Sequence, residues 1–180
     1  MIRKFKDFTP SIGKRVFVDI QATVIGDVCL GDDVSIWPQS VIRGDINPIT
    51  IGKRTNIQDG SIVHVTHKSQ YSDGCECHIG SDVTIGHGCI IHACTIEDMA
   101  LVGMGSVILD GTTISKKVII GAKSLVPSGK TLESGYLYMG APCKKIRPLK
   151  DDELEFLKYS ATHYVTVSYT HLTLPTILPV

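Results

Sequence analysis

Aromatic residues are scarce in this chain of 180 residues, at 6% against 43% hydrophobic residues in all. The apolar volume therefore comes mostly from Ile, Val, Leu and Ala, which suit a narrow β interior. A run of 18 apolar residues is also missing, so no transmembrane helix is expected. Eighteen Lys and Arg balance 18 Asp and Glu. Without an excess of charge, neither a nucleic acid nor a membrane surface is expected as a partner.

Signs of secretion are missing as well. The first ten residues, MIRKFKDFTP, lack the apolar core of a signal peptide. The six cysteines form no CxxC pair, so we expect a cytoplasmic protein with reduced thiols. Cys75 and Cys77, together with His78, have poor spacing for zinc. A regulatory disulfide between the two cysteines would close a strained ring.

What the chain does contain is a repeat with a period of six. Branched aliphatic residues recur at this spacing from Ile12 to Val126, with a nine-residue step after Ile42, a long interruption after Val63 and a five-residue step after Ile91. A second column of mostly small residues precedes the aliphatic positions by two, so the strand period points both columns inward. Helical spacings of three and four are absent. Each hexad is therefore predicted to be a short strand followed by a corner.

The pattern resembles the hexapeptide-repeat family, whose fold is a left-handed parallel β-helix with three hexads in each triangular turn. This resemblance implies an all-β protein with six triangular turns over residues 12–131. Both interruptions fall at the third corner, so we expect a protruding loop at 64–78. A β-sandwich of short strands is the alternative, but it rarely keeps one register over so many residues.

The segments on either side of the repeat differ in composition. Residues 1–11 are expected to be a lead-in, and residues 132–150 a connector rich in Gly and Pro. Residues 151–165 have one apolar stripe and predict a C-terminal α-helix. Residues 166–180 contain no Asp, Glu, Lys or Arg and show no helical period, so they are interpreted as a tail, either an edge strand or a non-native extension. Two histidines outside the repeat receive no role: His163 and His171.

Three histidines of the repeat form a candidate metal centre. His64 and His92 each follow an inward aliphatic residue on the third face of neighbouring turns, with Arg43 one turn earlier. Rungs lie about 4.8 Å apart, so the two histidines point outward and can share one ion. His87 lies at the corner after the second face, next to Asp59 on the turn below. One chain alone is not expected to join all three, whereas packing around a cyclic axis brings a corner to a neighbouring face.

Three neutral imidazoles with one open position are a donor set for catalytic zinc. Cobalt or iron(II) suit the same ligands. A metal held in this way lowers the pKa of its bound water to about 7. The alternative is that these are ordinary surface or interface histidines. The stacking of two of them beside Arg, Gln and Asp favours the metal.

This region contains four motifs, RGD (Arg43–Asp45), NIQDG (Asn56–Gly60), His64 and GHxxxxH (Gly86–His92). They are similar to the motifs of the gamma-class carbonic anhydrases, and the resemblance covers roughly residues 10–164. It implies a homotrimer with three interfacial zinc sites, at which metal-bound hydroxide converts carbon dioxide reversibly to bicarbonate. One subunit would supply His64 and His92, and its neighbour His87.

Further roles follow from the same resemblance. Arg43 and Asp45 would form a salt bridge between subunits. Gln58 would orient the metal-bound hydroxide, and Asp59 would support the histidines from behind. Tyr159 would close the pocket.

The chain departs from the most active relatives at positions that export protons. Those proteins carry a glutamate after the RGD aspartate and another three residues after the first metal histidine, where this chain has Ile46 and His67. An isoleucine cannot carry a proton, whereas His67 can act as a shuttle because the ordinary pKa of histidine is near 6.5. A solvent-facing loop histidine is the alternative. Thr162 replaces an asparagine of the relatives.

Two other functions stay open from the sequence. The same solenoid serves many acyltransferases that depend on coenzyme A and use a histidine as general base, although these usually need one such histidine. A metal-bound trimer with little or no hydratase activity is the other, suggested by the missing carboxylates.

Overall fold

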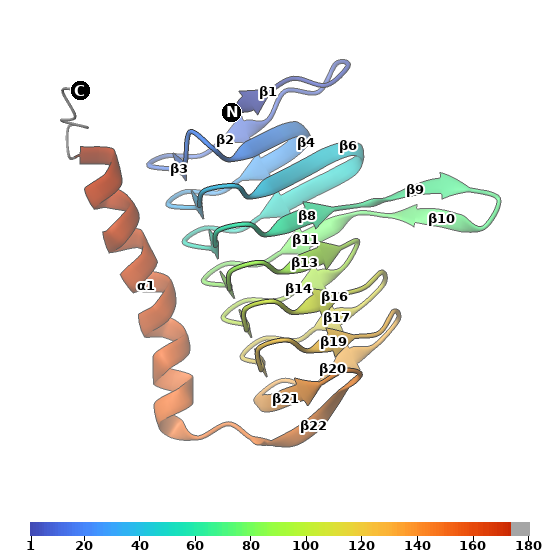
Figure 1. Cartoon of the computed structure of the whole chain (residues 1–180), viewed down its shortest axis with the longest axis vertical. Helices are drawn as coiled ribbons and strands as arrows, with labels where there is room; N and C mark the ends of the chain where they lie inside the picture. Colours follow the sequence, from blue (N-terminus) through green and yellow to red (C-terminus); the bar gives the residue numbers. More distant parts are fainter. Residues whose placement is uncertain (174–180) are drawn as a thin grey trace.

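The protein is a triangular β-solenoid with one long helix along its side (Figure 1). The structure is a computed structural model, and it describes residues 1–173. It has the predicted left-handed parallel β-helix fold. Strands on each face pair in parallel with the strands of the turns above and below, so every face is a ladder of short strands.

The strands divide among three faces. The first face contains β2 (Ser11–Ile12), the ends of β4 (Thr23–Leu30) and β6 (Val41–Ile51), β11 (Cys77–Ile79), β14 (Thr95–Ile96), β17 (Thr113–Ile114) and β20 (Thr131–Leu132). The second face contains β3 (Phe17–Val18), β5 (Ser35–Ile36), β7 (Asn56–Ile57), β12 (Thr84–Ile85), β15 (Leu101–Val102), β18 (Ile119–Ile120) and β21 (Tyr136–Gly140). The third face contains β1 (Ile2–Arg3), the starts of β4 and β6, β8 (Ile62–His64), β13 (Ile90–His92), β16 (Val107–Ile108) and β19 (Leu125–Val126).

The core is the column of aliphatic residues that the six-residue period predicts. Ile36, Ile57 and Ile85 are fully buried on three successive rungs of the second face. The small residues of the second column fill the corners, where several of them are hydroxyl residues. Ser61 donates a hydrogen bond to the carbonyl of Gly86 at 2.9 Å, and Thr55 donates to that of Gly80 at 2.7 Å. Among the described residues, no buried side-chain nitrogen or oxygen lacks a partner.

The predicted boundaries of the solenoid are too narrow at both ends. Before residue 12, β1 already pairs with β4. After residue 131, β20 and β21 continue the first and second faces, and β22 (Cys143–Pro148) pairs antiparallel with β21. The segment predicted as a connector, 132–150, is therefore mostly strand. Gly140 and Pro142 mark the tight turn between β21 and β22, which the composition alone does not distinguish from a linker.

The interruption after Val63 leaves the third corner as predicted, but it is an ordered hairpin. Strands β9 (Thr66–Ser69) and β10 (Ser72–Cys75) pair antiparallel and project from the solenoid (Figure 1). His64 itself belongs to β8, and the last residues of the predicted loop belong to β11.

Helix α1 (Asp151–Thr173) is longer than the predicted 151–165. It packs along the second face against β3, β5, β7 and β12. Its last two turns pack on Trp37, which is 8% exposed and meets His171 edge-on at a ring distance of 5.2 Å. The interpretation of 166–180 as a non-helical tail is thus wrong up to Thr173, and residues 174–180 lie outside the described part. Tertiary contact with an aromatic side chain, rather than helical period, holds this segment.

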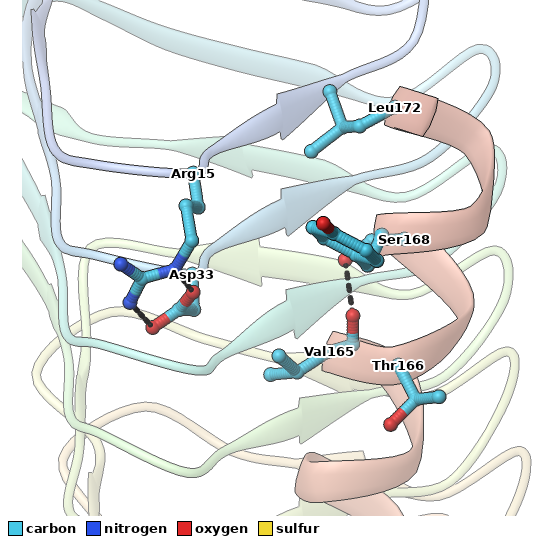
Figure 2. Close-up of a pocket in the computed structure, with 7 residues that line it drawn as sticks. Arg15, Asp33, Val165, Thr166, Ser168 and Leu172 are labelled. Carbon is cyan, nitrogen blue, oxygen red and sulfur yellow. Dashed lines mark hydrogen bonds and ion pairs between the residues drawn. The ribbon is translucent and has the colours of Figure 1, made fainter. Parts of the chain in front are cut away.

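A cleft of about 360 Å³ lies between the last turns of α1 and the first two turns of the solenoid (Figure 2). Arg15 and Asp33 form a two-point ion pair on the solenoid side. On the helix side, the Ser168 hydroxyl donates to the carbonyl of Val165 at 2.9 Å. None of the predicted site residues lines this cleft. Among residues 1–173, no helix combines the length and apolar character that a membrane span requires.

Candidate metal centre

Two of the predicted histidines meet on adjacent rungs of the third face. His64 ends β8, His92 ends β13, and the parallel register places them directly opposite each other. Nδ1 of His64 lies 3.2 Å from Nε2 of His92. The column predicted from the repeat is therefore a real contact between two imidazole nitrogens.

The outer nitrogen of each ring faces a carboxylate. Nε2 of His64 lies 3.1 Å from Oδ1 of Asp45, and Nδ1 of His92 lies 2.6 Å from Oδ1 of Asp110. Asp45 also accepts a hydrogen bond from Arg43, and Asp110 accepts one from the hydroxyl of Thr66. Carboxylates behind metal-binding histidines fix the tautomer and orientation of the rings.

This arrangement suits a cation between the two rings. When both outer nitrogens donate to their carboxylates, both inner nitrogens present lone pairs to each other, and a cation relieves their repulsion. Zinc binds histidine nitrogen at about 2.0–2.1 Å in tetrahedral geometry, which puts two ligand nitrogens about 3.3 Å apart. The observed 3.2 Å between His64 and His92 agrees with that separation. One shared proton would be the competing occupant, so binding of a metal there would release a proton.

The groups around the pair favour a neutral His64 ring beside ionised Asp45 and Asp110 carboxylates. Burial lowers the pKa of His64, and its hydrogen bond to Asp45 opposes that shift without cancelling it. Burial alone would raise the pKa of Asp45, but the hydrogen bonds from Arg43 and His64 outweigh it and lower the pKa. The pKa of Asp110 is lowered in the same way, against burial, by Thr66 and His92. Metal ligation needs the neutral imidazole.

The third histidine lies at a different edge of the solenoid. His87 faces Asp59, with Nδ1 2.9 Å from Oδ2, and both side chains are about half exposed, at 50% and 48%. Gly60 and Gly88, which follow these two residues, have φ values of +69° and +66° and make the corner. Here too, one imidazole nitrogen contacts a carboxylate, which leaves the other nitrogen to bind a ligand.

Gln58 lies beside this edge but is buried, with 5% exposure. Its amide donates to Oδ1 of Asn56 at 3.0 Å, and Asn56 donates to Thr84 at 3.1 Å. Thr84 in turn contacts the hydroxyl of Ser160 on α1 at 3.0 Å. The helix thereby fixes the position of Gln58 through a chain of buried hydrogen bonds.

Within one chain, the structure does not bring His87 together with the His64–His92 pair. Within residues 1–173, no group of three or more His, Cys, Asp or Glu side chains is placed to hold a metal ion. Arg43 pairs with Asp45 of its own chain, and a pairing between subunits stays a prediction. Tyr159 lies on the outer side of α1, 60% exposed and stacked on His163 at 5.5 Å. In a single chain, Tyr159 covers neither the His64–His92 pair nor His87.

The sequence pattern did not identify two contacts at this site, that of Asp110 with His92 and that of Asp45 with His64. Asp110 lies one residue beyond the position opposite His92 in the next turn, since Ile91 pairs with Ile108. Reading the column one rung further gives Leu109, so the six-residue period points to the neighbour of Asp110 and not to Asp110 itself. The contact of Asp45 with His64 depends on the course of β6 around its corner, which the repeat does not specify.

Comparisons with known proteins agree with this architecture. A family model for the bacterial transferase hexapeptide (six repeats) matches residues 9–44. Protein YrdA of Escherichia coli (strain K12) is 57% identical over 92% of this chain and 90% of its own length. Mitochondrial gamma carbonic anhydrase 2 of Arabidopsis thaliana is 42% identical over 92% of this chain, which spans 59% of the plant protein. A crystal structure of a putative acetyltransferase of Bacillus cereus superposes with a TM-score of 0.89 at 38% identity, over 96% of this chain and 98% of that one.

A triangular parallel solenoid with a six-residue period defines the class of hexapeptide-repeat β-helix proteins. The chain belongs to the hexapeptide-repeat family, among relatives that include the gamma carbonic anhydrases and YrdA.

Proposed function

We propose that this protein is a metal-dependent enzyme of the gamma carbonic anhydrase type, which converts carbon dioxide reversibly to bicarbonate. The observation that carries the proposal is the pair of imidazole nitrogens 3.2 Å apart on His64 and His92. Each ring is held from behind by an ionised carboxylate. The 42% identity to a protein named gamma carbonic anhydrase supports the same assignment.

We infer that the active assembly is a homotrimer in which His87 of one subunit meets His64 and His92 of the next. The third face supports this inference, because its outer surface is apolar beside the histidine pair. Ile62 and Ile90 are 43% and 42% exposed and lie directly opposite each other. A stacked apolar stripe next to an incomplete donor set is suited to burial against a second copy.

The three histidines would hold zinc, with iron(II) or cobalt suiting the same donors. When bound, such a metal makes hydroxide available from water near neutral pH. Asp45 and Asp110 keep the outer nitrogens of His64 and His92 protonated, so the inner nitrogens remain free as ligands. Gln58, fixed from α1, would orient the attacking oxygen, and Asp59 would hold the ring of His87.

Each turnover must also export a proton. His67 is exposed on β9 and lines a cleft that also contains Asp45 and Ile46. A histidine at this place can pass protons between the centre and solvent, because an imidazole both accepts and releases protons. Ile46, 45% exposed, cannot. We propose His67 as the shuttle and Tyr159 as a closing residue contributed across the interface.

Metal content and carbon dioxide hydration, measured on one anaerobic preparation, test the proposal. We expect about one metal per chain by elemental analysis and hydration in stopped-flow assays. Metal should be lost in His64→Ala, His87→Ala and His92→Ala alike. His163→Ala, at an exposed histidine away from both parts, is the matched control and should keep the metal. A fully zinc-loaded protein without detectable hydration would rule out the enzyme and leave the metal-bound trimer.

Acyl transfer is the second candidate, because the similar Bacillus cereus structure is described as a putative acetyltransferase. Acyl transfer requires no metal, so an assay of metal-free protein distinguishes it from hydration. If metal-free protein releases coenzyme A from acetyl-CoA with an amine or alcohol acceptor, acyl transfer replaces hydration as the function. The facing imidazole pair favours the metal, because a general base needs only one of the two rings.

A further inference from the structure

A second cleft, of about 560 Å³, lies beside the histidine pair. Its walls come from three segments that are far apart in the sequence. They are the lead-in turn with Lys6 and Phe8, the corner of β6 with Ile46 and Pro48, and the start of the projecting hairpin with Lys68 and His67. In Figure 1 the lead-in turn and the β9–β10 hairpin both project on the side where β6 turns.

The charges in this cleft are unbalanced. Lys6 and Lys68 are exposed lysines, and neither forms an ion pair within residues 1–173. Of the two carboxylates that line the cleft, Asp45 is already held by Arg43 and His64, which leaves Asp27. Two ammonium groups without a carboxylate partner thus face one carboxylate, with His67 beside them, and the Lys6 ammonium lies 5.5 Å from the centroid of the Phe5 ring. The surplus favours an anion.

The floor of the cleft is rigid. Strands β4 and β6 approach so closely there that a Cβ on Gly44 would lie 2.4 Å from the carbonyl oxygen of Asp27. A Cβ on Gly26 would lie 2.2 Å from the carbonyl oxygen of Gly44. The amide of Asn47 also donates to the carbonyl of Thr66 at 2.6 Å, which ties the corner of β6 to the hairpin. A preformed site loses less conformational entropy on binding.

One wall of the cleft is apolar. Phe8 is 50% exposed and Ile46 is 45% exposed, and Pro48 of β6 also lines this wall. Bicarbonate is too small and too polar to use this wall, whereas a short hydrocarbon chain can cover it. We propose that the cleft binds a small organic carboxylate, whose anionic group meets Lys6 and Lys68 and whose short apolar body lies on Phe8 and Ile46. The ligand would lie next to Asp45, which orients His64.

Titration of the intact protein with sodium acetate, sodium butyrate and sodium bicarbonate, at constant ionic strength, tests this site. The readout is the Cε1 proton resonance of His67 in the NMR spectrum. We expect saturable shifts with both carboxylates, and butyrate binding up to about tenfold more tightly than acetate for its two extra buried methylene groups. Lys6→Gln and Lys68→Gln should each weaken both carboxylates about fivefold or more. Phe8→Ser should remove the preference for butyrate.

Matched variants separate this site from the metal centre. Lys53→Gln, at an exposed lysine outside the cleft, should leave both affinities unchanged. His64→Ala should abolish metal binding and yet retain butyrate, so failure of the proposed hydratase function does not affect this result. Equal weakening by Lys53→Gln and Lys68→Gln, binding of bicarbonate without butyrate, or no saturable shift would each overturn the proposal.

Discussion

At the scale of single residues, the proposed metal centre depends on how the rings of His64 and His92 are oriented. The sequence register alone places His64 and His92 on neighbouring rungs, because one six-residue period fixes which residues stack. Their inner nitrogens face each other only because Asp45 and Asp110 bind the outer ones. Those contacts depend on side-chain torsions and on the corner of β6, which the period does not encode.

Asp110→Asn tests this orientation. An amide is neutral and can turn its NH₂ group toward Nδ1 of His92, so the ring loses its charged acceptor and its fixed tautomer. We expect metal affinity to fall about 10–100-fold, measured by competition with a chelator. Asp73→Asn, at an exposed carboxylate on the projecting hairpin, should bind metal like the wild type. Unchanged affinity in Asp110→Asn would show that this carboxylate has no role at the centre.

At the scale of elements, the period predicted the rungs well and the ends of the array poorly. Interior rungs such as β12 and β15 repeat one sequence pattern, so the pattern of each rung supports the register predicted for the next rung. The terminal strands β21 and β22 break that pattern and pair antiparallel. Helix α1 continues past Val165 although the sequence there has no helical period. Its last turns pack on Trp37, a contact between residues far apart in the chain, and such packing supplies most helical stability in proteins.

Trp37 is the single tryptophan of the chain, so its fluorescence reports on these last helical turns. A chain that ends at Val165 loses His171 and exposes the indole ring. We expect a red-shifted emission maximum and a loss of about 1–3 kcal/mol in unfolding free energy. A chain that ends at Thr173 should keep the wild-type spectrum. If both truncated chains emit alike, the contact of α1 with Trp37 does not hold in solution.

The start of α1 gives a prediction about pH. Arg147 binds the Glu153 carboxylate at two points, 2.7 and 2.8 Å, and the backbone N–H of Lys150 also donates to it. These contacts lower the pKa of Glu153 from 4.5 to about 2. A lowered carboxyl pKa stabilises the fold above the unfolded value, and that stabilisation is lost as pH falls toward the folded value.

Glu153→Gln should therefore be less stable than the wild type above about pH 4.5, and the difference should vanish as pH falls toward about 2. Urea unfolding of both proteins across this range, followed by circular dichroism, measures the difference. Glu155→Gln, two residues on in the same helix, removes a carboxylate that forms no ion pair within residues 1–173, so it should show no such convergence. A constant gap between Glu153→Gln and the wild type at all pH values would contradict the ionic origin.

At the scale of the whole molecule, the His64–His92 pair and His87 lie at different edges of one solenoid, so the proposed centre would need a second copy to be complete. Mixed assemblies test this requirement. His64→Ala subunits retain His87, and His87→Ala subunits retain His64 and His92. Neither should be active alone. If the two are unfolded together in equal amounts and refolded, random trimers should recover about a quarter of the wild-type activity, since each site needs one donor of each kind at probability one half. A site contained within one subunit predicts no recovery at all, and refolding His64→Ala with His92→Ala should give none in either case, because both remove ligands from the same face.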